Sequence, residues 1–148
     1  MPVTKSSCCP IAKSISYLGD RWTLIILRDI LLLHKTRFKE FKASREQIAS
    51  NILSIRLKML LKEGFIEILN PLGTKKSRQY IAIEKGISTL PILIELYLFS
   101  LHDIPTSLFS EKELASQKMI SENPTLFKEN IVNGYLAFVK ELKAGIGI

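Results

Sequence analysis

The sequence predicts a mainly α-helical fold with one small β-hairpin, and three observations predict it. Apolar residues recur at helical spacing over most of the 148 residues. After Gly64 this spacing gives way to two short runs of β-type pattern. The net charge of +7 lies within residues 34–87, which hold twelve Lys or Arg against five Glu. The rest of the chain is neutral overall, so we expect one part of the fold to face a polyanion.

The composition limits the class of protein. At 47% hydrophobic residues, the chain can fill one core, or one core with an appended interface element. The longest apolar run, residues 24–33, is interrupted by Arg28 and Asp29 and is shorter than the roughly 20 residues of a membrane helix. The first ten residues lack the apolar segment of a secretory signal. We therefore expect a cytoplasmic protein with no membrane partner.

The residues that usually carry chemistry are sparse. Cys8 and Cys9 are neighbours, and neighbouring cysteines rarely form a disulfide because the geometry strains the backbone. His34 and His102 are far from them in sequence and show no zinc-site spacing. Phosphate-binding loops, nucleophile elbows and His-Glu-x-x-His helices are not found. We expect no enzymatic activity, no metal and no cofactor.

Two helices are predicted before the basic stretch. Residues 10–18 suit a short helix with Pro10 in the first turn and Gly19 at its end. Asp20 suits the N-cap of a second helix that continues to about Leu33. This second helix is apolar on most sides, so it must be central, covered on both faces by neighbours or on one face by another subunit.

The basic stretch begins with two more predicted helices. Phe38 and Phe41 mark a two-turn helix with a connector, and a longer helix runs from residue 49 or 50 to 63, before Gly64. The inward stripe of the longer helix is Ile52, Leu53, Leu57, Leu60 and Leu61. Its outward face carries Ser50, Asn51, Ser54, Arg56 and Lys58. Short polar groups near the N-terminus, followed by cations, suit contacts with the base edges and phosphates of double-stranded DNA.

The two β-type runs, residues 65–69 and 79–83, are joined by a loop rich in turn signals. The loop carries Lys75, Lys76 and Arg78. On its own, such a loop would be interpreted as a solvated hairpin tip. Because it follows the polar-faced helix, we favour a wing at residues 70–80 that contacts the DNA backbone or minor groove. The predicted core is thus a winged helix-turn-helix.

The remaining residues are predicted to be helical. Residues 85–102 suit one further helix, with Pro91 in its first turn or at a kink. Ser110 and Glu113 have the spacing of a capping box, and a last helix runs from Pro124 to Gly145. The last two helices add apolar surface without net charge, so we expect them to form a dimer interface. The predicted division is a DNA-binding domain, residues 8–102, and a C-terminal dimerisation extension, residues 105–148.

In these elements the chain resembles the HxlR-type winged helix-turn-helix transcriptional regulators, relatives of the MarR group. The resemblance covers roughly residues 8–102 and rests on the order and spacing of five short pieces. These are Cys9-Pro10, residues 19–28 (Gly-Asp-Arg-Trp-Thr-Leu-Ile-Ile-Leu-Arg), residues 37–41 (Arg-Phe-Lys-Glu-Phe), residues 57–64, and Tyr80 with Gly86. The resemblance implies a recognition helix at residues 49–62, and a homodimer whose terminal helices form the interface and whose two wings flank a near-palindromic operator.

The chain departs from the family pattern at three places. Gly19-Asp20-Arg21 stands where Gly-Gly-Lys is usual before Trp22. Residues 46–49 (Glu-Gln-Ile-Ala) replace Pro-Gly-Ile-Ser, which removes the usual Ser cap and leaves Ser50 as the expected substitute. In the wing, Lys76-Ser77 and Gln79 replace two prolines and an acid. These changes bear on the wing's shape and on the operator preference.

The candidate contact residues each have a structural alternative. Ser50 and Asn51 would contact bases or cap the helix, and Ser54 lies one turn further on. Arg37 would contact DNA or hold the connector helix in place. Trp22 is expected in the core. The phosphate candidates are Arg56, Lys58, Lys75, Lys76 and Arg78.

The adjacent thiols have two interpretations. Cys9 corresponds to a cysteine common in the family, which in some members senses oxidants or electrophiles. Lys5, Lys13 and the start of the following helix would lower the pKa of its thiol. Alternatively, Cys8 and Cys9 are small buried hydrophobic residues. The effector would be a thiol-reactive compound at these residues or a small apolar molecule between the long helices, or there is none.

The sequence thus predicts a homodimeric, sequence-specific DNA-binding transcriptional regulator. Two recognition helices, at about residues 49–63 of each chain, would enter major grooves about 34 Å apart. The alternative is a winged-helix protein-interaction module that docks an acidic partner, because a fold does not fix a function. A thiol redox enzyme using Cys8 and Cys9 is a third possibility, without the usual Cys-x-x-Cys motif.

Overall fold

The structure is a computed structural model and describes residues 8–148. Lys5, one of the residues expected to act on the Cys9 thiol, lies outside the described residues. The chain forms α1 (Pro10–Leu18), α2 (Arg21–Leu31), α3 (Phe38–Lys42), α4 (Ser50–Lys62), β1 (Ile66–Ile68), β2 (Tyr80–Ala82), α5 (Glu84–Ile87), α6 (Leu90–Ser100), α7 (Glu111–Glu122) and α8 (Pro124–Gly145). Single 3-10 turns at Leu101–Asp103 and Thr106–Leu108 connect α6 to α7.

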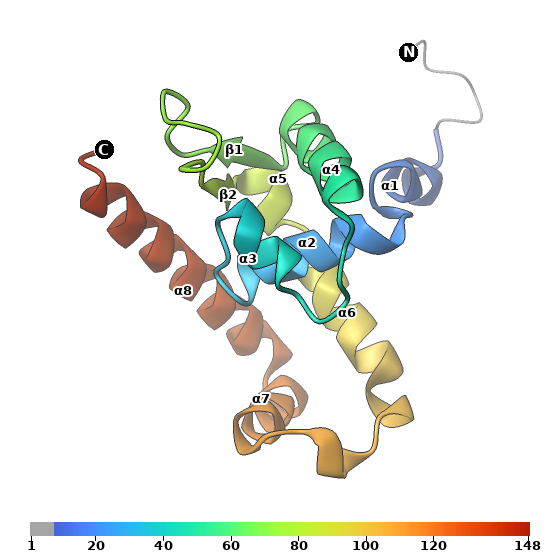
Figure 1. The fold of residues 1–148 in the computed structure, drawn as a ribbon. Helices are drawn as coiled ribbons and strands as arrows, with labels where there is room; N and C mark the ends of the chain where they lie inside the picture. Colours follow the sequence, from blue (N-terminus) through green and yellow to red (C-terminus); the bar gives the residue numbers. More distant parts are fainter. Residues whose placement is uncertain (1–7) are drawn as a thin grey trace.

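Helix α2 is central, as its apolar sequence predicts. Figure 1 shows it surrounded by α1, α3, α4 and α8, with the hairpin above it. Its buried residues include Ile26, Leu27, Ile30 and Leu31, which share one core with the inward residues of α4. The Asp20 side chain caps the helix by accepting hydrogen bonds from the backbone N–H groups of Trp22 and Thr23, as expected from sequence. The capping box of Ser110 and Glu113 at the start of α7 is also present.

The winged helix-turn-helix core is confirmed. Strands β1 and β2 pair antiparallel, with Ile66 opposite Ala82 and Ile68 opposite Tyr80. Helix α4 lies directly before β1, and the loop between the strands projects beside α4 (Figure 1). The fold is mainly α-helical with this one hairpin, within residues 8–148.

Two local predictions are wrong. Residues 85–102 do not form a single helix. Thr89 donates hydrogen bonds to the carbonyl of Gly86 from both its backbone N–H (3.1 Å) and its hydroxyl (2.6 Å), and these bonds close a turn between two helices. The chain therefore forms α5 and α6 separately, with Pro91 in the first turn of α6. Ser50 does not replace the missing cap: Ala49 occupies the N-cap of α4, and no side chain caps this helix.

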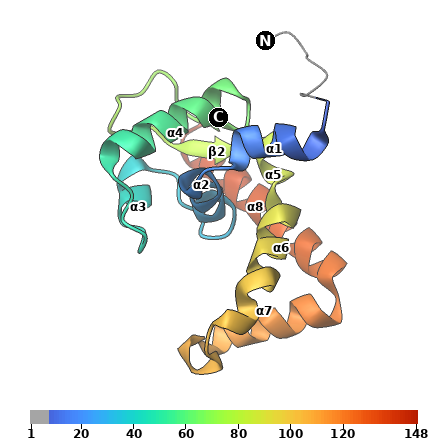
Figure 2. The same cartoon turned by 90° about the vertical axis from the view of Figure 1, so that its right-hand side faces the viewer.

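Helix α8 returns to the winged core. The hydroxyl of Tyr135, only 1% exposed, accepts a 2.7 Å hydrogen bond from the backbone N–H of Ala82 in β2. Burial raises the pKa of this hydroxyl to about 12. The His34 ring stacks on Phe138 at 4.5 Å between centroids. Part of α8 thus packs on its own chain. The first half of α6 also belongs to the core, whereas its second half and most of α7 extend away from it (Figure 2). The division into a DNA-binding domain, residues 8–102, and a dimerisation extension, residues 105–148, stays a prediction.

Gly86 should tolerate no side chain. It is buried, and a Cβ atom there would lie 2.2 Å from the carbonyl oxygen of Phe65. We expect Gly86→Ala to lower the free energy of unfolding by about 1–3 kcal/mol, because backbone would have to move. The matched control is Gly134→Ala, where nothing lies within 4 Å and helix propensity predicts a gain of up to about 1 kcal/mol. Urea titration measures both; equal stability of Gly86→Ala and the parent would refute the close approach.

Candidate nucleic-acid interface

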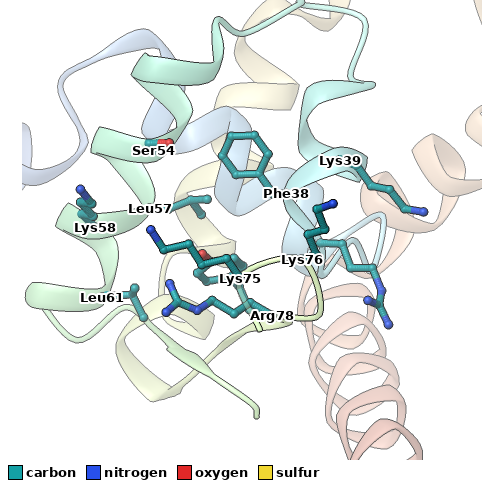
Figure 3. A pocket seen from close by; sticks show the side chains of 11 residues that line it. Phe38, Lys39, Ser54, Leu57, Lys58, Leu61, Lys75, Lys76 and Arg78 are labelled. Atoms are coloured by element: carbon teal, nitrogen blue, oxygen red, sulfur yellow. The ribbon is translucent and has the colours of Figure 1, made fainter. Parts of the chain in front are cut away.

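One surface gathers α3, α4 and the wing loop around a hollow of about 640 Å³. Figure 3 shows this hollow with side chains from all three elements around it. Its floor is apolar and is formed by Phe38, Leu57, Leu61 and Tyr80. Six cations also line it, and none of its lining residues is an Asp or Glu: Arg37, Lys39, Lys58, Lys75, Lys76 and Arg78.

Helix α4 is anchored by its inward face and leaves its polar face open. Leu53, Leu57 and Leu60 are at most 2% exposed, as the predicted stripe requires. Ser50 and Asn51 are exposed in the first turn, Ser54 is half-buried beside the hollow, and Lys58 is exposed. The polar face predicted from sequence is therefore accessible to a ligand as large as a duplex.

A buried ionic network holds the segment that leads into α4, and sequence reasoning missed it. Asp29, 1% exposed, lies at its centre. Its carboxylate accepts hydrogen bonds from Arg28 Nη2 (2.7 Å), Lys35 Nζ (3.0 Å) and the Ser44 hydroxyl. Lys35 Nζ also lies 2.6 Å from Ser44 Oγ. The network ties the end of α2 to the turn after α3.

Glu46, one of the departures from the family pattern, extends this network. Arg28 donates to both of its carboxylate oxygens, at 2.6 and 3.0 Å. These hydrogen bonds are the main reason that the pKa of Glu46 falls to about 2. The next residue, Gln47, adopts a positive φ of 55°, and Lys42 Nζ donates to the carbonyl of Ile48 at 2.6 Å. Together these contacts fix the turn before α4, where the family pattern usually has Pro-Gly.

Arg56, one of the candidate phosphate contacts, has an acidic partner within the chain. Arg56 Nε lies 3.3 Å from Asp20 Oδ1, and this side chain does not line the hollow. The pKa of Asp20 is lowered: burial acts against ionisation, but hydrogen bonds from Thr23 and Trp22 and the charge of Arg56 outweigh it. Arg37 lines the hollow. The first turn of α3 is capped by Glu40, whose carboxylate accepts hydrogen bonds from the backbone N–H groups of Thr36 and Arg37.

The wing loop is shaped by hydrogen bonds of the Asn70 and Gln79 side chains. Asn70 Nδ2 donates to the carbonyl of Ser77 (3.1 Å), and Asn70 Oδ1 accepts from the backbone N–H of Gln79 (3.2 Å). Gln79, another departure from the family, accepts from the Thr36 hydroxyl at 3.0 Å and so links the wing to the start of α3. Lys75 and Lys76 are exposed.

The cysteines lie apart from the hollow. Cys8 and Cys9 are exposed and directly precede α1, with Cys9 at its N-cap. At the other end of α1, the Tyr17 ring packs edge-on against Phe65 at 5.6 Å, and Lys85 Nζ lies 4.3 Å from the Tyr17 ring. Trp22 is partly buried and packs against the core, with the Arg21 guanidinium over its ring at 4.7 Å.

Within residues 8–148, no helix combines the length and the apolar character needed to cross a bilayer.

Comparisons of sequence and of structure both find similarity to transcriptional regulators. The model of the HxlR-like helix-turn-helix family matches residues 17–106. The HTH-type transcriptional regulator YvaP of Bacillus subtilis is 32% identical over 95 residues, which are 64% of this chain and 87% of YvaP. A second B. subtilis regulator of the HTH type, YdzF, is 26% identical over 92 residues, 62% of this chain and 84% of YdzF.

Two solved structures share the fold. PA1607, described as a candidate transcription factor, superposes with a TM-score of 0.60 at 28% identity over 72% of this chain and 73% of its own. The reduced form of the transcriptional regulator YodB from B. subtilis gives 0.52 at 28% identity, over 62% of this chain and 90% of its own. Since the family model spans more than half of the residues, the chain belongs to the HxlR-like helix-turn-helix family of DNA-binding transcriptional regulators.

Proposed function

We propose that the chain acts as a homodimer that binds a specific double-stranded DNA sequence through α4 and the wing. The observation that carries this proposal is the concentration of six cations, and no acid, around the hollow between α3, α4 and the wing loop. Such a surface attracts phosphates strongly, and cations dominate the salt-dependent part of DNA affinity. The exposed first turn of α4 adds hydrogen-bonding groups that suit base edges.

The proposed contacts divide by kind. Ser50, Asn51 and Ser54 would contact bases from the major groove, because the N-terminal part of a recognition helix usually enters it. We assign the contacts with the DNA phosphates to Arg37, Lys58, Lys75, Lys76 and Arg78. Arg56 stays beside Asp20, so we assign it to holding α4 against the start of α2, with phosphate contact as a lesser role.

Dimerisation is supported by apolar surface that the single chain leaves open. Phe99 is 85% exposed and Leu108 is 72% exposed on and beside the arm formed by α6 and α7, while Ile11 on α1 is 71% exposed. Exposed apolar surface of this kind suits burial against a second copy of the chain. To read successive major grooves, the proposed dimer would hold its two α4 helices about 34 Å apart, one turn of B-form DNA.

The proposed dimer predicts that one charge introduced at Phe99 shifts the equilibrium between dimer and monomer. We expect Phe99→Lys to convert the dimer to monomers at micromolar concentration, because a cation would be buried against an apolar partner. Analytical ultracentrifugation measures the mass, and Lys62→Gln, exposed at the end of α4 and outside this arm, serves as a control. A Phe99→Lys protein that remains dimeric would place the interface elsewhere.

Any response to oxidants or electrophiles is assigned to Cys8 and Cys9. Both thiols are exposed, and α1 connects them to the base of the wing through Tyr17, Phe65 and Lys85. A covalent change at the start of α1 would thus act on the element that carries the wing's cations. The structure of the similar transcriptional regulator YodB is described as a reduced form.

The proposed reading of bases is tested in the first turn of α4. We expect Ser50→Ala with Asn51→Ala to weaken binding to the selected sequence about tenfold or more, since a good base contact contributes about 1–3 kcal/mol. Non-specific DNA should bind almost unchanged. The sequence is first selected from genomic fragments, and fluorescence anisotropy then gives both affinities.

The matched control removes one Ser and one Asn from other helices, Ser121→Ala with Asn133→Ala, both exposed. This control should keep full specificity. If the α4 variant also keeps it, α4 does not read bases directly. Failure to select any DNA, together with salt-sensitive binding of an acidic protein, would favour the protein-interaction module.

A further inference from the structure

The hollow beside α4 has the size and the lining of a small-molecule site. Its volume of about 640 Å³ falls in the range of about 300–1,000 Å³ typical of ligand pockets. Phe38 and Leu61 are half-buried and offer aromatic and aliphatic surface, whereas Leu57 and Tyr80 are buried beneath them. A phosphate of the DNA backbone has no apolar part to place on this floor, so DNA contact at the rim leaves the floor unused.

Two cations lie over this floor. Figure 3 shows Lys75 and Arg78 reaching from the wing loop toward α4, whereas the Lys39 side chain points away toward α8. The Nε atom of Arg78 is buried and has no hydrogen-bond partner among the described residues. A buried donor without an acceptor is unfavourable, and a carboxylate can satisfy a guanidinium through two parallel hydrogen bonds.

From this geometry we infer that the hollow binds a flat organic anion, an aryl carboxylate, with its ring on Phe38 and Leu61 and its carboxylate on Arg78 and Lys75. The inference rests on the proposed function in one respect. Arg78 and Lys75 cannot pair with the carboxylate and with a DNA phosphate at the same time, so the anion and the duplex exclude each other. The effector would then act directly on the DNA-binding face, away from both the cysteines and the space between the long helices.

Binding is tested without DNA, by isothermal titration calorimetry of the full chain with 2-naphthoate. The neutral analogue 2-naphthalenemethanol, which keeps the ring and lacks the charge, is the matched probe. We expect one naphthoate per chain and at least about tenfold weaker binding of the alcohol, because the charge-assisted hydrogen bonds are lost. Equal affinities for the two probes would overturn the inference, since they would indicate a merely apolar patch.

Two variants locate the site. Arg78→Gln removes the guanidinium, and Ser54→Phe fills the hollow from α4 without changing the charge. Each should weaken naphthoate binding at least about tenfold, whereas Lys112→Gln on α7 should leave it unchanged. Circular dichroism verifies that each variant is folded. Unchanged naphthoate affinity in both folded variants would place the ligand elsewhere and refute the site.

Exclusion of DNA is tested separately with a labelled duplex. Naphthoate at ten times its dissociation constant should weaken duplex binding about tenfold if the two share one site. Naphthoate that binds without affecting the duplex would refute the shared site. If no duplex binds at all, the proposed function fails, while calorimetry still decides whether the hollow takes the anion.

Discussion

The Asp29→Ala variant is expected to lose about 2–3 kcal/mol of unfolding free energy, because hydrogen bonds to a buried charged group are lost while the cations left behind reach solvent. Asp29 is 1% exposed and accepts from Arg28, Lys35 and Ser44. Without the Asp29 carboxylate, the positive charges of the half-buried Arg28 and Lys35 would lose the negative charge that lies between them. Because these groups tie α2 to the turn before α4, the variant should also weaken DNA binding through the position of α4.

Urea unfolding measures the stability, and two comparisons define the cause. Asp29→Asn keeps the size and one acceptor oxygen, so its loss should be smaller than that of the alanine variant. Asp103→Ala, in an exposed 3-10 turn, should change the free energy by less than about 0.5 kcal/mol. An Asp29→Ala protein as stable as the parent would show that the network contributes nothing to the fold.

The second large effect concerns the wing. Replacing Lys75, Lys76 and Arg78 by Gln should weaken DNA binding about a hundredfold or more at 0.1 M salt, because a dimer would lose six phosphate contacts. The loss should be similar for selected and non-selected sequences, since phosphate contacts carry no sequence information. Fluorescence anisotropy with both duplexes measures it.

The control for the wing variant removes the same charge from the C-terminal helices, through Lys112→Gln, Lys128→Gln and Lys140→Gln. These residues lie on α7 and α8 and do not line the hollow, so their loss should weaken binding much less. Equal losses in the two triple variants would mean that overall charge, and not the wing, determines affinity.

Elements with local signals were predictable from the sequence. Asp20 and the pair of Ser110 and Glu113 marked helix starts that the structure confirms, because a cap depends on residues within one turn. The change of period after Gly64 located the hairpin, and the apolar stripe of α4 gave its inward face. Lys58 of α4 does meet the cations of the wing loop on one surface, as their order along the chain suggested, whereas Arg56 lies beside Asp20 instead.

The features that were missed depend on contacts between distant residues. Asp29 and Ser44 are 15 positions apart, and Ala82 and Tyr135 are 53 apart, so no local pattern indicates either pair. The break at Thr89 was hidden because apolar residues continue through Ile87 and Leu90 in a helix-like pattern. The apolar floor of the hollow was equally hidden, since Phe38 and Leu57 looked like ordinary core positions.

The central claim is that this cationic surface binds the phosphates of duplex DNA, and a salt titration tests it most directly. The affinity of the unmodified protein for a selected duplex is measured by anisotropy between 50 and 300 mM salt. The account predicts a linear fall of log K with log salt, with a slope of about −9, the value for the ten phosphate contacts of a dimer. An affinity that stays flat over this range would contradict it.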